Sequence, residues 1–424
     1  MSFIRAPPEW GIEPVPEELR KLRHFDIAVL WSSLGVGLLV MQAGALLVQW
    51  LNLSVIEAII ISIVGSIIGS LILAVAGIIG GKYGVPTMVS LRPIMGLKGS
   101  YLLTFLNVIQ LVGWTTFEFI VMGDAATAIT GEFLGSYTKY FWITIVAIWC
   151  YLMATLGPLA VVREWLEKFA IWIVYLSSIW ITLNITSVIS FSPQQFSGSI
   201  SALLLGLDLV VAMPISWMPL IADYNRFNRS SREGVIGTFI GYTIANTWFY
   251  SMGACLAYVY PGESVVYSIA LIYLGVLAIL GILVDETDNA FADIYSSAVS
   301  LQNIFQKTRQ WKLALFVTVI SLILAYTIPI AEYESFLLLI GASFIPIFGI
   351  MMGDALIIRK LNYDVTEFYG KAPSIKWSAV FSWIIGFTVY YLLSYVFVDL
   401  SIGASIPTLI TSLLIYVLIE KARR

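Results

Sequence analysis

Apolar runs of about 20 residues recur along the chain, separated by short polar connections. An apolar α-helix of that length spans the hydrocarbon core of a bilayer. The pattern therefore predicts an all-α polytopic membrane protein with twelve transmembrane helices. The predicted spans are residues 26–50, 55–80, 101–130, 139–158, 168–190, 200–222, 235–259, 265–302, 313–331, 334–358, 377–397 and 400–420.

The positive charges in the connections support this count. Every Lys and Arg except Lys139 falls in alternate connections or at the two ends of the chain. Because such residues gather on the cytoplasmic side of membrane proteins, we expect both termini in the cytoplasm. A miscount by one span would break the alternation. The expected location is the cell membrane.

Composition narrows the classes of function. The chain has 424 residues, of which 59% are hydrophobic and 12% charged, and its net charge is -3. Short loops and the lack of a long basic tract predict no soluble domain and no nucleic-acid partner. Cys150 and Cys255 fall inside predicted spans, where we interpret them as small apolar fillers. The residues before the first span do not resemble a signal peptide, so we expect no cleavage.

Acidic side chains inside the predicted span 265–302 are the most informative polar feature. They are Asp285, Glu286, Asp288 and Asp293. A carboxylate at the centre of a membrane helix costs about 2.5–3.5 kcal/mol on insertion scales, so the cluster should face a cation, a polar ligand or water. At 100° per residue, one helix face carries Asp285, Asn289, Asp293 and Ser296. For Asp285 and Glu286, structural pairing or lining of a water-filled vestibule is as well supported as a ligand role.

Two predicted spans contain residues that interrupt helices. The first has three glycines near its middle, including Gly37, and the sixth has Pro214 and Pro219 around Trp217. Paired interruptions at matching positions of two repeats indicate a transporter site at the membrane midplane. The alternative is that the glycines only allow close packing and the prolines only kink the helix.

Five stretches of the chain resemble one family. They are EPVPEELRKLRHFDIAVLW, YGVPTMVSLRPIMGLKGSYLLTFLNVIQLVGW, ADYNRF, TDNAFADIYSSAVSLQNI and FLLLIGASFIPIFGIMMGDALIIRKLNY. In order and placement they resemble the nucleobase:cation symporter-1 family, and PISWMPLIADYNRF is most similar to the cytosine and hydroxymethylpyrimidine permeases. The resemblance implies a LeuT-like fold. Its expected parts are a cytoplasmic arm (1–25), two inverted five-helix repeats (26–190 and 200–358), two further helices (377–420) and a cytoplasmic end (421–424).

The resemblance also implies a substrate site between the broken spans and spans three and eight. In the family, a flat base stacks on an aromatic ring of the third span, and a polar side chain one turn later pairs with its edge. Those positions are Trp114 and Glu118. Hydantoin carriers have an amide where this chain has Glu118, and a carboxylate accepts from the exocyclic amine of an aminopyrimidine. The other implied contacts are Gly37, Trp217 (or Pro214 by an ungapped match), Asn289 and Asp293.

A coupling cation is implied in the same way, and it is Na⁺ or H⁺. The implied ligands are backbone carbonyls of Ser33, Val36 and Val284, the Thr287 hydroxyl, and the Asp288 carboxylate where the family has a hydroxyl. A carboxylate at this position can ligate Na⁺ or take up the proton itself. The sequence leaves both alternatives open.

We therefore expect a symporter that imports a nucleobase or related heterocycle by alternating access, with cytosine or a hydroxymethylpyrimidine-like aminopyrimidine favoured. A purine, allantoin or hydantoin importer is the alternative within the family. A membrane-embedded enzyme or a channel is a further alternative, but the sequence has no HExxH, GxSxG, CxxC or Walker A motif. We expect no catalytic residue, no cofactor besides the coupling ion, and no obligatory protein partner beyond the lipid bilayer.

The other polar residues fit structural roles better. We interpret His24 as an interfacial residue rather than a proton relay, and Asp354 as structural. Asp223 and Arg226 are expected to form an ion pair or a cap at the end of the sixth span. Asp208 either lines the cavity or pairs within the bundle.

Overall fold

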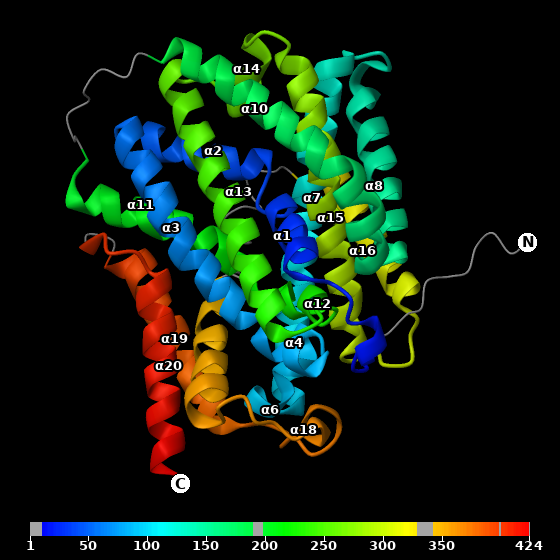
Figure 1. The fold of residues 1–424 in the computed structure, drawn as a ribbon, viewed down its shortest axis with the longest axis vertical. Helices are drawn as coiled ribbons and strands as arrows, with labels where there is room; N and C mark the ends of the chain where they lie inside the picture. Colours follow the sequence, from blue (N-terminus) through cyan, green and yellow to red (C-terminus); the bar gives the residue numbers. More distant parts are fainter. Residues whose placement is uncertain (1–10, 190–197, 329–341, 398–399, 424) are drawn as a thin grey trace, which may run out of the picture.

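The chain folds into packed helices joined by short connections (Figure 1). The computed structural model describes residues 11–189, 198–328, 342–397 and 400–423. The first half contains η1 (Glu17–Leu19), α1 (His24–Ser33), α2 (Leu38–Gln49), α3 (Val55–Ala76), α4 (Ile78–Tyr83), α5 (Thr87–Ser90), α6 (Arg92–Met95), α7 (Leu97–Thr130), η2 (Gly135–Tyr137), α8 (Thr138–Leu156), α9 (Pro158–Ala160), η3 (Val161–Ala170) and α10 (Ile171–Val188). The second half contains α11 (Ile200–Ser216), η4 (Met218–Leu220), α12 (Ile221–Asn225), α13 (Ser231–Val259), α14 (Val265–Leu271), α15 (Gly275–Gln302), α16 (Gln310–Thr327), the helix Ala342–Ile358 with η5 (Gly353–Ile358) at its end, α18 (Val365–Tyr369), α19 (Trp377–Tyr391), η6 (Leu392–Val396) and α20 (Ser405–Ala422).

Within the described ranges, eight helices are long and apolar enough to cross a membrane, and the bent pair α1 and α2 makes nine. Helices also stand at the other three predicted span positions. Two of them, α13 and α15, have 29 and 28 residues but carry more polar side chains, many of them buried in the bundle. The third is Ala342–Ile358, and the earlier residues of that predicted span lie outside the described part.

Both predicted interruptions are present. The axes of α1 and α2 differ by 63° across the break between Ser33 and Leu38. In the sixth span, α11 ends at Ser216, a short 3-10 turn follows, and α12 resumes at Ile221. The glycine-rich and proline-rich segments therefore interrupt two spans.

The predicted start of the eighth span is wrong. Residues 265–302 form two helices, because α14 ends at Leu271 and the chain turns before α15 begins at Gly275. Leu274 adopts a left-handed conformation with φ +56°. A Cβ at Gly275 would lie 1.8 Å from the Ile269 carbonyl oxygen, so the turn needs a glycine there. The apolar run is continuous through this turn, and hydropathy therefore gave no sign of it.

Close backbone approaches hold the helices around the broken spans. Helix α13 packs along α1, α2 and α3, and α7 packs along α15. Where α13 crosses α2, a Cβ added to Gly253 would lie 1.9 Å from the Met41 carbonyl oxygen, and one added to Gly44 would lie 2.1 Å from the Tyr250 carbonyl oxygen. Small residues of this kind let membrane helices pack backbone against backbone.

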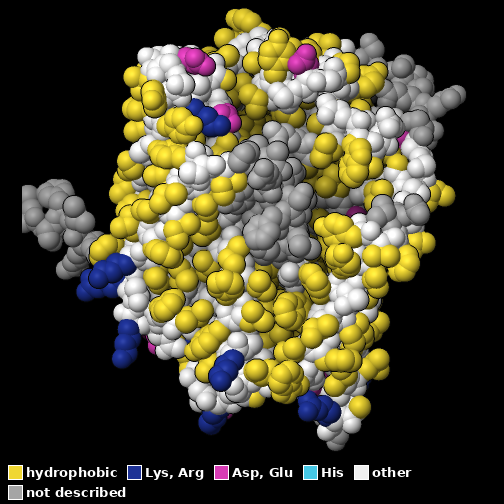
Figure 2. Space-filling model, turned by 180° about the vertical axis from the view of Figure 1, so that it is seen from behind, with side chains coloured by type: hydrophobic (Ala, Val, Ile, Leu, Met, Phe, Trp, Pro, Cys, Tyr) yellow, Lys and Arg dark blue, Asp and Glu magenta, His cyan; other side chains and the backbone are white. Residues whose placement is uncertain are grey.

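The surface has the character expected of a membrane protein. Figure 2 shows hydrophobic side chains across most of one face, with Lys and Arg side chains gathered mainly towards one end. A bilayer solvates such an apolar face, and charged side chains remain outside the hydrocarbon. The chain is a multi-pass membrane protein, and the cytoplasmic position of its basic end remains a prediction.

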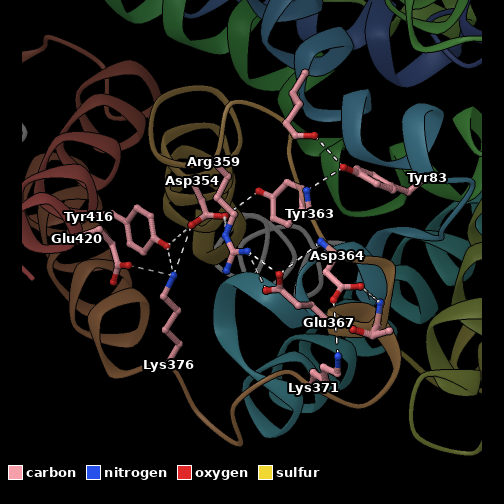
Figure 3. A network of polar contacts seen from close by, with 12 residues as sticks. Tyr83, Asp354, Arg359, Tyr363, Asp364, Glu367, Lys371, Lys376, Tyr416 and Glu420 are labelled. Carbon is pink, nitrogen blue, oxygen red and sulfur yellow. Dashed lines mark hydrogen bonds and ion pairs between the residues drawn. The ribbon is translucent and has the colours of Figure 1, made fainter. Parts of the chain in front are cut away.

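A buried polar network attaches the C-terminal helices (Figure 3). Asp354, fully buried in η5, accepts hydrogen bonds from the hydroxyls of Tyr363 at 2.7 Å and Tyr416 at 2.5 Å. Lys376 and Arg359 each lie 3.4 Å from its carboxylate oxygens. Burial, followed by the Asp354 charge, raises the pKa of Tyr363, so its phenol stays protonated and donates. These contacts agree with the structural role predicted for Asp354.

Candidate functional site

A cavity lies between the break of the first span and helices α7, α11 and α15. Its empty volume is about 530 Å³, a figure that includes the part open to solvent. All six residues expected to contact a substrate lie in its wall: Gly37, Trp114, Glu118, Trp217, Asn289 and Asp293. These residues come from four segments that are far apart in the sequence.

Two indole rings contribute to the wall. Trp114 lies on α7 with its ring edge-to-face against Phe117, at a centroid distance of 6.1 Å. Trp217 follows the end of α11 and packs edge-to-face on the fully buried Trp31 at 6.3 Å. Pro214 is not in the wall and contacts Gly69 of α3 instead, so of the two alternatives in the sixth span only Trp217 faces the cavity.

The wall of α7 is one helix face. Gln110, Trp114 and Glu118 are spaced four residues apart, and all three line the cavity. Gln110 was missed from the sequence, although its spacing of four residues from Trp114 was a usable signal. Glu118 is only 5% exposed, and its Oε2 atom has no hydrogen-bond partner in the protein. Ser216, beside Trp217, is a second polar wall residue that the sequence did not single out.

Asn289 lines the cavity and has one unpaired acceptor. Its Nδ2 atom donates to the Val36 carbonyl and to the Glu286 carboxylate, each at 3.3 Å. Because both of these partners are acceptors, the amide orientation is fixed and Oδ1 is the free atom. That oxygen is buried without a partner in the protein. Asn289 and Glu118 therefore offer oxygen acceptors from two different helices.

Glu286 links the cavity wall to the broken first span. Its side chain is 1% exposed, and its carboxylate accepts a hydrogen bond from the backbone N–H of Leu38, the first residue of α2. It also lies in hydrogen-bonding contact with the Glu118 carboxyl, and this contact requires a proton on one of the two carboxyls. The sequence left the role of Glu286 open, because a backbone N–H of another span leaves no mark in the residue pattern.

Two of the residues expected at the cation site, Ser33 of α1 and Asp288 of α15, are in direct contact. The Ser33 hydroxyl donates to Asp288 at 3.1 Å, and Asp288 is 1% exposed. The Thr287 hydroxyl donates to the Val284 carbonyl at 2.8 Å. The Ser33 carbonyl, the group expected to act as a ligand, accepts one hydrogen bond from the Val36 N–H, and the Ser33 hydroxyl makes a further contact with Asp288.

The remaining polar candidates lie away from the cavity wall. Asp208 accepts from the backbone N–H groups of Ala404 and Ser405, at 3.0 and 2.9 Å, at the start of α20. Asp223 accepts from the N–H of Thr87 at 2.9 Å, so it caps the start of α5 rather than the end of the sixth span. His24 is 61% exposed and pairs with Glu233. The side chain of Asp285 lies outside the part that the structure describes.

Metal chemistry of the zinc type has no counterpart in the described residues. They contain no group of three or more His, Cys, Asp and Glu side chains that could hold a metal ion. The Ser33 hydroxyl and the Asp288 carboxylate that it contacts are both oxygen groups, which suit a hard cation rather than a soft one.

Broken helices around a midplane cavity define a membrane transporter of the LeuT-like class. Residues 14–416 match the family described as permeases for cytosine/purines, uracil, thiamine and allantoin, and the chain belongs to this family. It is therefore a transporter and not an enzyme.

Named relatives agree with this membership. The allantoin permease of Bacillus subtilis (strain 168) is 25% identical over 337 residues, which cover 70% of this chain and 68% of that protein. The purine-uracil permease NCS1 of Arabidopsis thaliana is 24% identical over 400 residues, which cover 86% of this chain and 66% of that protein. The matched parts thus span about two thirds of each relative.

Solved structures share the fold at lower identity. Mhp1, a nucleobase-cation-symport-1 family transporter in a closed conformation with bromovinylhydantoin bound, gives a TM-score of 0.80 at 17% identity, covering 98% of this chain and 95% of that one. A Na⁺-coupled sialic acid symporter in a substrate-bound outward-open state gives 0.65 at 14% identity, covering 94% and 90%. These matches agree with the LeuT-like arrangement expected from the sequence.

Proposed function

We propose that the protein imports a nucleobase-like heterocycle by symport with Na⁺ or H⁺, and that a cytosine-like or hydroxymethylpyrimidine-like aminopyrimidine is preferred. The observation that carries the proposal is the single cavity lined by Trp114, Trp217, Glu118 and Asn289. Alternating access would expose this cavity to each side of the membrane in turn.

The preference for an aminopyrimidine rests on the polarity of the wall. Indole faces stack with flat rings. The free oxygens of Glu118 and Asn289 accept hydrogen bonds, and an exocyclic amine supplies the matching N–H groups. Leaving a buried acceptor unpaired costs about 1–3 kcal/mol, so a ring with few donors should bind less well.

The coupling ion is proposed to bind at Asp288. The carbonyls of Ser33, Val36 and Val284 and the Thr287 hydroxyl are the other proposed oxygen ligands. Ser33 belongs to α1 and Asp288 to α15, so an ion here would bridge the broken first span and the helix that carries Asn289. Such a bridge would link ion occupancy to the shape of the cavity.

Allantoin or a purine is the second candidate substrate, because the relatives matched over much of the chain are named for them. Allantoin also carries several N–H donors, so the free acceptors favour it over a donor-poor ring such as uracil. Measured affinities for an aminopyrimidine and for allantoin are needed to decide between these two candidates.

The test is ligand binding to purified protein, followed by tryptophan fluorescence. The panel is cytosine, hydroxymethylpyrimidine, uracil, adenine, allantoin and hydantoin, with and without Na⁺ and across pH. We expect an aminopyrimidine to bind most tightly, with a cation-dependent affinity that Asp288→Ala abolishes. Tighter binding of allantoin or adenine would show that the proposed preference for an aminopyrimidine is wrong. If no compound of the panel binds, the proposal is refuted.

A further inference from the structure

The N-terminus of α2 opens onto the cavity. Helix α2 has 12 residues and begins at the break of the first span, and Gly37, Leu39 and Val40 all line the cavity wall. The first N–H groups of a helix have no partner within it and carry partial positive charge, so such an end attracts anions. In transporters with broken helices, this end commonly receives an anionic group of the substrate.

In this protein, a side chain already occupies that place. Glu286 of α15 accepts the hydrogen bond of the Leu38 N–H. Gly37 allows this approach, because a Cβ at that residue would lie 3.2 Å from Glu286 Oε1. The other carboxylate oxygen accepts from Asn289 Nδ2 at 3.3 Å. The helix end and the cavity-facing amide are therefore held by the same buried carboxylate.

The wall also offers no positive charge to an anion. Glu118 and Asp293 line the cavity, and its described lining residues include no Lys, Arg or His. The free polar atoms on Asn289 and Glu118 are acceptors. A carboxylate brought into this cavity would lose its hydration without gaining a cation or the helix end, and burying such a charge unpaired is costly.

We propose that Glu286 is a specificity-determining residue: its carboxylate serves as a built-in anion at the α2 N-terminus, so the cavity accepts rings with N–H donors and rejects rings that carry a carboxylate. This inference rests on the proposed function and specifies its substrate class further. Glu286 acts by filling the place that a substrate carboxylate would otherwise take.

The first experiment compares two ligands that differ by one carboxylate, cytosine and cytosine-5-carboxylate, by fluorescence titration. The native protein should prefer cytosine. In Glu286→Ala, the helix end is vacant. The ratio of the dissociation constant of cytosine-5-carboxylate to that of cytosine should therefore fall by about tenfold, which is the size of a favourable buried helix-end interaction. Glu286→Gln keeps an acceptor for the Leu38 N–H and should retain the fold. Because this variant loses only the charge, the ratio of the two dissociation constants should fall by less than in Glu286→Ala.

Asp208→Ala is the matched control. Asp208 is another carboxylate at a helix N-terminus, that of α20, but it is not in the cavity wall. Its removal should leave the ratio of the two affinities unchanged. A ratio that shifts equally in Asp208→Ala and Glu286→Ala, or that stays unchanged in both Glu286 variants, would overturn the proposal.

A second readout needs no heterocycle. Sodium formate should raise the thermal unfolding temperature of Glu286→Ala relative to sodium chloride, because formate can refill the vacant helix end, and it should leave the native protein unchanged. If no ring binds the native protein but formate stabilises the variant, the substrate proposal fails while the role of Glu286 stands. If formate has no effect and the ring preference is also unchanged, the role of Glu286 fails.

Discussion

Trp114 and Glu118 lie one turn apart on α7, and both face the cavity. The tryptophan offers a flat face, and the carboxyl offers an acceptor buried from water. A direct contact between the Glu118 and Glu286 carboxyls places one edge of the cavity next to the helix end of α2. We therefore expect recognition of the ring edge to depend on the Glu118 carboxyl, whose position is set by its contact with Glu286.

Glu118→Gln should weaken aminopyrimidine binding by roughly ten- to hundredfold, because the amide has one acceptor oxygen instead of two and a buried group left unpaired costs about 1–3 kcal/mol. Trp114→Ala should cost a similar amount, about 1–3 kcal/mol, through lost stacking. The measurement is the dissociation constant from fluorescence titration. Asp124→Asn, an exposed acid-to-amide change on the same helix, is the control and should have no effect. Unchanged affinity in Glu118→Gln, with loss only in Trp114→Ala, would remove Glu118 from the site.

At the level of helices, the crossing of α2 and α13 depends on two glycines. Gly44 of α2 packs against the backbone of Tyr250, and Gly253 of α13 packs against the backbone of Met41. The α2 segment carries the cavity-facing turn after the break, so this crossing also supports the site. A larger residue would separate the helices or force the backbone to shift.

Gly253→Ala should lower the thermal stability of the detergent-solubilised protein. Alanine normally stabilises a helix relative to glycine by about 1 kcal/mol, but a Cβ 1.9 Å from the Met41 carbonyl oxygen is overpacked, at a typical cost of 1–3 kcal/mol. Gly99→Ala in α7 is the control, because the nearest atom there is the Cβ of Met95, four residues earlier in α6, at 3.1 Å. An unfolding temperature for Gly253→Ala at or above that of the native protein would contradict the prediction.

For the whole molecule, the Asp354 network ties the helix Ala342–Ile358 to α19 and α20 (Figure 3). Its residues are absent from the cavity wall. We therefore expect the network to support the assembly of the bundle rather than ligand recognition.

Asp354→Asn should destabilise the protein by up to about 3–5 kcal/mol, the cost of breaking a buried ion pair, and by less if Glu420, 3.4 Å from Lys376, compensates. Thermal unfolding measures the loss. Ligand affinity of the folded fraction should not change. The control is Asp364→Asn, since that side chain is 55% exposed. A folded variant with normal stability but altered affinity would show that the network acts on the site.

The residue pattern also predicted much of the site. The six cavity residues were named from a family resemblance, and helix periodicity placed Trp114 and Glu118 on one face. Gln110 followed the same periodicity and was overlooked. The start of α15 was missed because local backbone geometry, rather than hydropathy, breaks the apolar run at Leu274.

The sequence by itself determined the membrane class, the positions of most spans and the two broken helices. These properties are local, because each span must satisfy its own backbone hydrogen bonds and be apolar enough for lipid. Only the tertiary structure decided which carboxylate meets which backbone group. The pairing of Glu286 with Leu38 and that of Asp208 with α20 join residues 248 and 196 positions apart. Such pairings depend on how the helices pack, and no periodicity along one chain segment encodes them.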